Sequence, residues 1–180
     1  MIDFEFEFQY AEEKAPALRN TVGSVPKERC VVLCGGSGCG KSTLLRCING
    51  LIPQFYEGEL KGFCRLAGKD TDGLSIDEIG ELAASVFQDP RSQFFTVNSS
   101  NEVAFGLENH GLPQEKIRQR VDEAFRTFHL DHLKGRNVYE LSSGERQRIS
   151  IARAIMKDAP IVILDEATAD VTLPPKMKRN

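Results

Sequence analysis

The chain has 180 residues, of which 41% are hydrophobic and 27% are charged, and its net charge is -3 at pH 7. These values indicate a soluble globular domain with a core of ordinary size, and they exclude the overall basic surface that is typical of nucleic-acid binding. No apolar run approaches the roughly 20 residues of a membrane span, and the first residues lack the pattern of a secretory signal. The five cysteines form no C-x-x-C pair, which argues against a disulfide framework or a zinc site and favours a reducing compartment.

A half-buried strand is predicted at the N-terminus, because apolar and polar residues alternate over residues 2–10. One face of this strand would carry Ile2, Phe4, Phe6, Phe8 and Tyr10. The pattern is typical of an antiparallel sheet, and residues 17–25 and 58–67 are expected to add further strands to it.

An apolar strand is predicted over residues 30–34, followed directly by a glycine-rich loop and a helix from Thr43 to Gly50. We expect this strand to be buried, with Cys30 and Cys34 acting as small hydrophobic side chains.

Capping boxes mark two further helix starts, one at Ser75 with Glu78 and one at Ser99 with Glu102. Between them, residues 82–88 form an apolar stretch that resembles a strand.

Two longer helices are predicted over residues 113–130 and 144–157. Their apolar residues recur at helical spacing, and we interpret both stripes as core packing. The stripes comprise Ile117, Val121, Ala124, Phe125 and Phe128 in the first helix, and Ile149, Ala152, Ile155 and Met156 in the second. A buried parallel strand over residues 161–164 is predicted to follow.

The glycine-rich stretch, called the phosphate loop below, spans residues 35–43 and fits the pattern G-x-x-x-x-G-K-[ST] between a strand and a helix. Glycines let the backbone N–H groups point into one concavity, and the helix adds the positive end of its dipole. Lys41 can then reach the β- and γ-phosphates of a nucleotide, and the Ser42 hydroxyl can bind Mg²⁺. The sequence therefore predicts a nucleoside-triphosphate site. Its predicted nucleotide-binding residues are Gly36, Ser37, Gly38, Cys39, Gly40, Lys41, Ser42 and Thr43.

Asp165 and Glu166 directly follow the predicted parallel strand. Carboxylates at the carboxyl end of such a strand face the crevice where doubly wound sheets bind ligands. Asp165 fits the residue that holds Mg²⁺, and Glu166 can orient or deprotonate an attacking water. Two acids after an apolar run are more often a helix cap or a turn, but the phosphate loop upstream reverses that balance.

A Ser/Gly turn opens the last predicted helix within residues 141–148, a stretch called the signature turn below. Either Ser142 or Ser143 is expected to be the N-cap, and the turn's N–H groups can also cradle an anion.

These motifs, in this order, resemble those of ABC transporter nucleotide-binding subunits over about residues 2–170. Residues 86–90, with Gln88, resemble the Q-loop, the signature turn resembles the family sequence LSGGQ, and residues 164–169 resemble the Walker B strand and its extension. Tyr10 stands where the family places the aromatic side chain that stacks on adenine. Residues 49–58 and 102–106 are similar to those of energy-coupling-factor (cobalt-type) importer ATPases, which import vitamins or transition-metal ions.

The resemblance implies an α/β fold with a P-loop NTPase core and a mostly parallel sheet, an N-terminal antiparallel β subdomain and a helical subdomain at about residues 90–157. Residues 1–170 would form one ABC-type nucleotide-binding domain, and residues 171–180 a divergent tail.

Ser143 and Glu145 replace the usual Gly and Gln of the signature. Thr172 stands where the D-loop Asp is expected, and the three histidines precede the signature, so the final strands and the switch histidine of the family are expected to be missing. An uncovered sheet edge would make the chain weakly stable and prone to self-association.

The resemblance also implies a mechanism. Two ATPase subunits, identical or different, would pack head to tail and sandwich ATP between the phosphate loop of one and the signature turn of the other. Glu166, Lys41 and Gln88 would be catalytic, and Ser42, Gln88 and Asp165 would organise Mg²⁺. Ser142 and Gly144 would contact the γ-phosphate from the second subunit.

A transmembrane transporter subunit is the second implied partner, which places the chain at the cytoplasmic face of the cell membrane as a peripheral protein. The segment after Gln88, residues 90–105, would contact that partner. Phe94 and Phe95 in this segment are either an exposed contact patch or part of the core.

Three functions are compatible with these motifs. The leading one is an ATP-binding and hydrolysing subunit that energises an importer for a vitamin or metal ion. The second is a hydrolysis-deficient nucleotide-binding module, favoured by the missing switch histidine. The third is a soluble ABC-type ATPase of DNA repair or translation, disfavoured by the net charge and the single cassette.

Overall fold

The computed structural model describes residues 1–89, 93–109 and 111–166. The chain divides into two compact units. The first comprises Met1–Ala84 and Ala159–Ile163, and the second comprises Ser85–Asp158 and Leu164–Asn180. The predictions about the D-loop and the tail at residues 171–180 lie outside the described residues.

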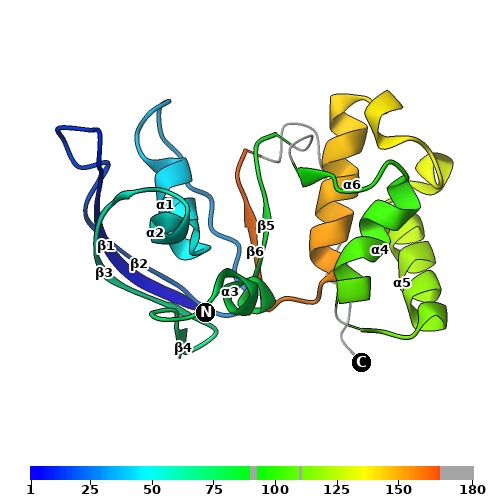
Figure 1. Cartoon of the computed structure of the whole chain (residues 1–180), viewed down its shortest axis with the longest axis horizontal. Coiled ribbons are helices and arrows are strands. Elements are labelled where there is room, and N and C mark those ends of the chain that lie inside the picture. The colour runs from blue at the N-terminus through cyan, green and yellow to red at the C-terminus, as the bar shows by residue number, and fades with distance from the viewer. Residues whose placement is uncertain (90–92, 110, 167–180) are drawn as a thin grey trace. The chain divides into compact units, whose positions relative to one another are not determined.

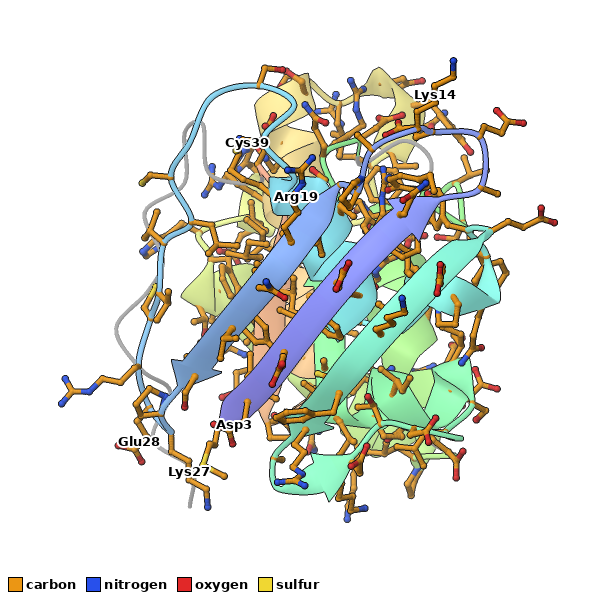
Figure 2. All side chains as sticks on the ribbon, turned by 90° about the vertical axis from the view of Figure 1, so that its left-hand side faces the viewer. Asp3, Lys14, Arg19, Lys27, Glu28 and Cys39 are labelled. Carbon is orange, nitrogen blue, oxygen red and sulfur yellow. The ribbon has the colours of Figure 1, made fainter. Side chains whose placement is uncertain are left out.

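The first unit contains a four-stranded antiparallel sheet in the order β2-β1-β3-β4. Its strands are β1 (Ile2–Tyr10), β2 (Leu18–Val25), β3 (Gly58–Leu66) and β4 (Lys69–Asp70). Figure 2 looks onto the outward face of β2, β1 and β3, which carries Asp3. Phe4, Phe6 and Phe8 are buried on the opposite face, so the alternation predicted for residues 2–10 is confirmed.

Three helices accompany this sheet: α1 (Lys41–Ile48), α2 (Leu51–Gln54) and α3 (Ile76–Leu82). Leu44 and Ile48 of α1 share one hydrophobic core with the phenylalanines of β1. The first capping box is confirmed, because the Ser75 Oγ accepts from the Glu78 N–H at 3.3 Å and the Ser75 N–H donates to Glu78 Oε2 at 2.8 Å.

Residues 30–34 do not form the predicted buried strand. They have no regular secondary structure, Val32 is 76% exposed, and Cys30 and Cys34 are also exposed. A run of β-branched residues favours an extended chain, but a strand also needs a neighbour that pairs with its N–H and C=O groups. Among the described residues no strand pairs with this segment.

The buried cysteines are Cys47 and Cys64 instead. Burial raises the pKa of the Cys47 thiol to about 12 and that of the Cys64 thiol to about 11. Both thiols therefore stay neutral and pack as small hydrophobic groups.

Strands β5 (Ala83–Val86) and β6 (Ile161–Leu164) pair with each other in a parallel sheet, and the division between the two units falls within both strands. Both strands were predicted. Ile161 and Ile163 are buried, but Val162 is 42% exposed, so β6 is covered on one face rather than on two as its apolar run suggests.

The second unit is mainly helical, with α4 (Ser99–Asn109), α5 (Gln114–Thr127) and α6 (Ser143–Met156) packed on one another (Figure 1). Short 3-10 turns at Asp131–Leu133 and Val138–Glu140 lead into α6. The two predicted long helices are confirmed, and their apolar stripes are core as predicted, except that Ile117 and Ile155 are half-buried. In the described part of the chain, no helix has the length and apolarity to cross a membrane.

The second predicted capping box, at Ser99 and Glu102, is wrong. Asn98 precedes α4, and its Oδ1 accepts from the N–H groups of Ser100 at 2.9 Å and Asn101 at 3.3 Å. The Ser99 hydroxyl donates instead to the Leu133 carbonyl at 2.6 Å. Glu102 is fully buried, because partners inside the unit hold its carboxylate away from the helix start.

Candidate nucleotide-binding site

The phosphate loop of the first unit folds back on its own lysine. Lys41 Nζ donates to the carbonyl oxygens of Gly35 at 2.9 Å and Gly36 at 2.8 Å. The ammonium group therefore points over the loop that precedes its helix, and phosphate oxygens can replace these carbonyls as acceptors.

Two glycines of this loop have left-handed backbone conformations, Gly38 with φ 75° and Gly40 with φ 93°. A Cβ on Gly40 would lie 2.9 Å from the Ala17 carbonyl oxygen, whereas one on Gly36 would meet nothing within 4 Å. The loop conformation thus requires glycine at position 40 for two reasons, the backbone angle and the close approach of β2's leading segment.

Helix α1 begins directly after this loop, with Gly40 as its N-cap. Among the described residues no side chain caps it, and no acidic residue stands in its first turn. The first N–H groups of a helix have no partner within the helix, and the positive end of the dipole favours an anion there. This arrangement fits a phosphate group.

The same loop fits a magnesium ion that arrives with a nucleotide. No group of three or more His, Cys, Asp or Glu side chains that could hold a metal occurs within the described ranges. Mg²⁺ needs no such cage, because it commonly takes one or two protein ligands together with phosphates and waters. Ser42, the second residue of α1, is a suitable ligand from the loop.

Tyr10, the predicted adenine-stacking residue, lies beside α1. Its hydroxyl is 3.2 Å from Thr43 Oγ1 and accepts from Arg46 Nη1 at 3.4 Å. The Arg46 guanidinium also lies 4.6 Å from the centre of the Tyr56 ring. Sequence reasoning missed Arg46 and Tyr56, although the i, i+3 spacing of Thr43 and Arg46 places both on one face of a helix.

In the second unit, the structure brings together residues far apart in the sequence. Gln88 Nε2 donates to Glu166 Oε2 at 2.6 Å across a separation of 78 residues. The Asp165 N–H donates to the Val86 carbonyl at 2.9 Å, which fixes the end of β6 against β5. Glu166 has φ 50°, a left-handed conformation that costs about 1 kcal/mol for a residue with a side chain.

Gln147 is a further contact of this group that sequence reasoning missed. Its Nε2 donates to the Glu166 carbonyl oxygen at 3.3 Å. Its position in the first turns of α6, five residues after Ser142, is the only signal the sequence offers. Helix α6 therefore holds Glu166, the residue that was predicted to orient or deprotonate the attacking water.

The signature turn forms a complete capping box at the start of α6. Ser142, not Ser143, is the N-cap, and its Oγ accepts from the Glu145 N–H at 3.3 Å. The Glu145 carboxylate accepts from the Ser142 N–H at 2.8 Å and from its hydroxyl at 2.7 Å. These bonds from Ser142, with smaller contributions from His132 and Arg136, hold the pKa of the Glu145 carboxyl below its usual range.

Each unit thus assembles its own set of predicted site residues. The phosphate loop, Lys41 and Tyr10 belong to the first, and Gln88, Ser142 and Glu166 to the second. That the two sets act on one nucleotide stays a prediction.

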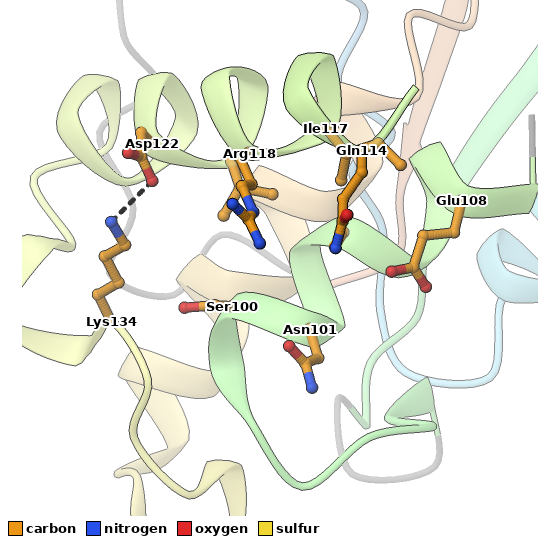
Figure 3. Close-up of a pocket in the computed structure, with 10 residues that line it drawn as sticks. Ser100, Asn101, Glu108, Gln114, Ile117, Arg118, Asp122 and Lys134 are labelled. Carbon is orange, nitrogen blue, oxygen red and sulfur yellow. Dashed lines mark ion pairs between the residues drawn. The ribbon is translucent and has the colours of Figure 1, made fainter. Parts of the chain in front are cut away.

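A separate cavity of about 420 Å³ lies between α4 and α5 of the second unit (Figure 3). Arg118 and Glu108 line it together with the ion pair of Asp122 and Lys134, whose charged atoms are 2.7 Å apart. No predicted nucleotide-site residue lines this cavity.

Solved structures share this fold. The chain superposes on cbiO1 from Clostridium perfringens, described as part of the ABC transporter complex cbiONQ, with a TM-score of 0.80 and 30% identity over 95% of this chain and 67% of that chain. The ATP-binding cassette MJ0796, in a post-hydrolysis state bound to ADP and Pi, gives a TM-score of 0.80 at 24% identity over 96% of this chain and 76% of that chain, a likeness of fold alone. The fold is that of the ATP-binding cassette proteins.

The chain belongs to the ABC transporter family, whose model matches residues 18–169. An ABC transporter ATP-binding protein of Treponema denticola is 40% identical over 91% of this chain and 34% of its own length. The HMP/thiamine import ATP-binding protein YkoD of Bacillus subtilis is 35% identical over 92% of this chain and 30% of its own length. The chain spans about a third of the length of these curated relatives.

Proposed function

We propose that this chain binds and hydrolyses ATP to energise an importer for a vitamin or a metal ion, with ATP sandwiched in a head-to-tail dimer of ATPase subunits. The observation that carries the proposal is the phosphate loop. Gly38 and Gly40 have left-handed backbones, Lys41 lies over the loop, and the helix begins with no capping side chain among the described residues. These are the features that a triphosphate anion needs.

The nucleotide-binding residues in this proposal are Tyr10 for adenine and the loop from Gly36 to Thr43 for the phosphates. Lys41 neutralises the developing charge on the γ-phosphate. Ser42, Gln88 and Asp165 would hold Mg²⁺, which would neutralise negative charge on the phosphates.

Hydrolysis in this proposal depends on Glu166, which orients or deprotonates the attacking water. The hydrogen bonds from Gln88 and Gln147 support this role because they hold the side chain and the backbone of Glu166 at the same time. Ser142 and Gly144 contact the γ-phosphate of a nucleotide bound to the second subunit, so that closing the dimer completes the site.

The importer part of the proposal draws on two similarities. YkoD carries a name that refers to HMP and thiamine import, and cbiO1 is described as part of a transporter complex. A transmembrane subunit would meet the segment around Phe95, whose ring is 70% exposed and stacks on Phe105 with 4.9 Å between ring centres. Phe94, by contrast, is buried. Such docking would place the chain at the cytoplasmic face of the membrane.

Phosphate release measured with and without the substitution Glu166→Gln tests hydrolysis. We expect the variant to bind ATP as the native chain does and to lose phosphate release by roughly 100-fold or more, since removing a general base costs that much. Equal rates in both proteins would contradict the proposed hydrolysis.

The second candidate is a nucleotide-binding module without turnover. Glu145, a carboxylate where the family usually has Gln, favours it, because it adds negative charge to the signature turn. Stabilisation of the fold by Mg-ATP without any phosphate release would support this candidate. If phosphate is released, the chain could equally be a soluble ABC-type ATPase, and reconstitution with a membrane subunit distinguishes that function from an importer subunit.

A further inference from the structure

Glu102 is a charged side chain with no exposed surface. It lies in the first turn of α4, and its Oε2 accepts from three donors of the preceding segment. These are the N–H of Phe95 at 3.0 Å, the N–H of Thr96 at 2.9 Å and the hydroxyl of Thr96 at 3.1 Å. One buried carboxylate therefore fixes the backbone of the segment that presents Phe95.

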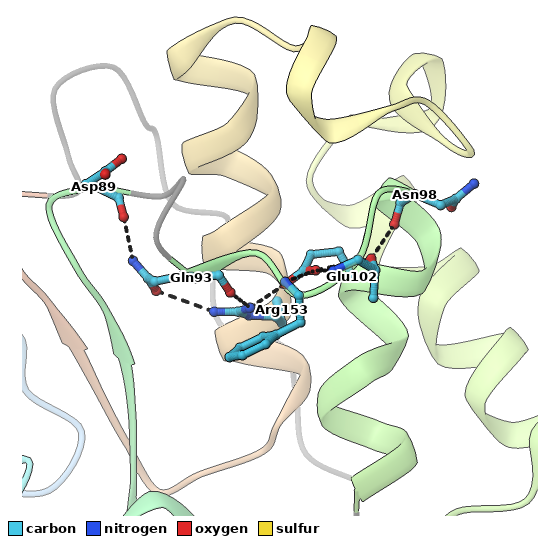
Figure 4. Close-up of polar contacts among 7 residues, drawn as sticks. Asp89, Gln93, Asn98, Glu102 and Arg153 are labelled. Atoms are coloured by element: carbon cyan, nitrogen blue, oxygen red, sulfur yellow. Dashed lines mark hydrogen bonds and ion pairs between the residues drawn. The ribbon is translucent and has the colours of Figure 1, made fainter.

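Arg153 of α6 joins this carboxylate to a second part of the same segment (Figure 4). Its Nη1 donates to Glu102 Oε1 and, at 2.6 Å, to the Gln93 carbonyl oxygen. Its Nη2 donates to Gln93 Oε1 at 3.4 Å. A planar guanidinium suits this task because its donors lie in a fixed fork.

Gln93 continues the chain of contacts toward the Q-loop. Its Nε2 donates to the carbonyl oxygens of Phe87 at 3.2 Å and Asp89 at 3.4 Å, the residues on either side of Gln88. The backbone that carries Gln88 is thereby bound through Gln93 to Arg153.

Helix α6 thus reaches the pair of Gln88 and Glu166 by two routes. Gln147 donates to the Glu166 backbone, while Arg153, further along the same helix, holds the Gln88 backbone through Gln93. The hydrogen bond between Gln88 and Glu166 joins the two routes. All of these residues belong to the second unit.

Burial of an ion pair is a poor way to gain stability, because desolvation of both charges offsets their attraction and apolar residues of similar size often do as well. The geometry therefore calls for another explanation. The contacts of Glu102 and Arg153 end on the backbone of residues 93–96, and Gln93 in turn donates to the carbonyl oxygens of residues 87 and 89, called the Gln88 segment here.

We propose that Glu102 and Arg153 are positioning residues that hold the Gln88 segment to α6, so that Gln88 and the signature turn move as one body. The inference rests on the proposed function, because Gln88 is the residue through which it acts. The Phe95 N–H donates to the same Glu102 carboxylate, so a partner that presses on Phe95 would move Gln88 and α6 together.

The experiment combines Glu102→Gln with Gln88→Ala in a double-mutant cycle of ATP hydrolysis. Glu102→Gln keeps an acceptor oxygen but removes the charge that Arg153 needs. We expect it to lower kcat roughly ten-fold and to leave KM for ATP within two-fold, since the phosphate loop is untouched. If Glu102 acts through Gln88, the double variant is no slower than Gln88→Ala alone.

Asp122→Asn is the matched control, because Asp122 forms an ion pair with Lys134 in the same unit but lies near the surface. It is expected to leave kcat unchanged. Arg153→Lys is the second variant, for use if Glu102→Gln does not fold, and it keeps the charge while losing the fork. Two results would overturn the proposal. One is a double variant whose loss of kcat equals the product of the losses in Glu102→Gln and Gln88→Ala. The other is a Glu102→Gln variant with native kcat and only a lower melting temperature.

Amide hydrogen exchange makes the test independent of turnover. The N–H groups of Phe95 and Thr96 are expected to lose protection by roughly ten-fold in the Glu102 variant, while the interior of α6 keeps its protection. Unchanged protection at these two amides contradicts the link itself. Absence of hydrolysis in the native chain would instead contradict the proposed function, and the exchange result would still decide whether the link exists.

Discussion

Helices α1 and α6 both begin at a turn rich in Ser and Gly, yet the two starts are built differently. The first follows a glycine in a left-handed conformation, and among the described residues no side chain caps it. The second has a complete capping box, in which Ser142 and Glu145 satisfy each other's backbone N–H groups. The comparison suggests a division of labour. Helix α1 has no capping side chain among the described residues at the end where we propose that phosphate binds, whereas α6 holds its own turn in shape through its capping box.

Removal of the Lys41 ammonium group tests the first half of this comparison most strongly. We expect Lys41→Ala to weaken Mg-ATP binding roughly 100-fold, because a hydrogen bond between charged groups contributes about 1.5–3 kcal/mol. Isothermal titration calorimetry measures the affinity. Lys61→Ala, which removes an exposed lysine paired with Glu59 in the same unit, should bind ATP as the native chain does. Similar losses in the two variants would mean that Lys41 acts only through overall charge.

Addition of a methyl group to the loop tests whether its conformation needs glycine. We expect Gly40→Ala to lower the free energy of unfolding by about 1–3 kcal/mol, because it combines a left-handed backbone with a contact to the Ala17 carbonyl. Gly36→Ala is the control, since no atom lies within 4 Å of its added carbon. Urea unfolding of both variants gives the difference, and equal stabilities would show that the loop adapts freely.

Loss of the cap at α6 should have a smaller effect. Ser142→Ala removes the acceptor for the Glu145 N–H, and N-caps of this kind contribute about 1 kcal/mol. The melting temperature is expected to fall by about 3 °C, as measured by circular dichroism. Ser143→Ala, one residue along the helix, serves as the comparison and should change it little. If the two variants melt alike, Ser142 is not the residue that stabilises the turn.

The smallest expected effect is a change in pH dependence at Glu145. Because hydrogen bonds from Ser142 lower the pKa of Glu145 in the folded chain, its stabilising contribution is fully present above the ordinary pKa of a glutamate, about 4.3. That contribution is lost as the pH falls through the lowered folded pKa. Glu145→Gln should therefore cost some stability at pH 7 and none in acid. A stability difference that does not change between pH 7 and pH 3 would contradict this account.

Much of the fold was predictable from local patterns. The alternation in β1 and the apolar stripe of α5 each follow from the spacing of apolar residues along the chain, and this spacing does not depend on which elements pack against them. Residues 30–34 show where this reasoning fails. An apolar run favours a buried strand, but it does not identify the strand that would pair with it.

The local geometry of the candidate site was predictable where a motif determines it, as in the phosphate loop, and less so where a residue works through distant contacts. Gln93 and Arg153 have no motif of their own, and their importance follows only from the hydrogen bonds that link Arg153 through Gln93 to the backbone beside Gln88. Glu102 was misinterpreted as part of a capping box. It stands beside the buried Val103 on the inward face of α4, where burying its charge costs more free energy than an exposed cap would.

The open segment before the phosphate loop has a practical consequence. Val31, Val32 and Leu33 present three consecutive branched side chains to water, beside backbone groups with no strand partner among the described residues. Any loose strand edge, from another molecule or a synthetic peptide, is a suitable guest for such a stretch. A short peptide designed to pair with this stretch would thus bind directly beside the phosphate loop. Its binding would be measured as reduced binding of a dye that reports exposed apolar surface.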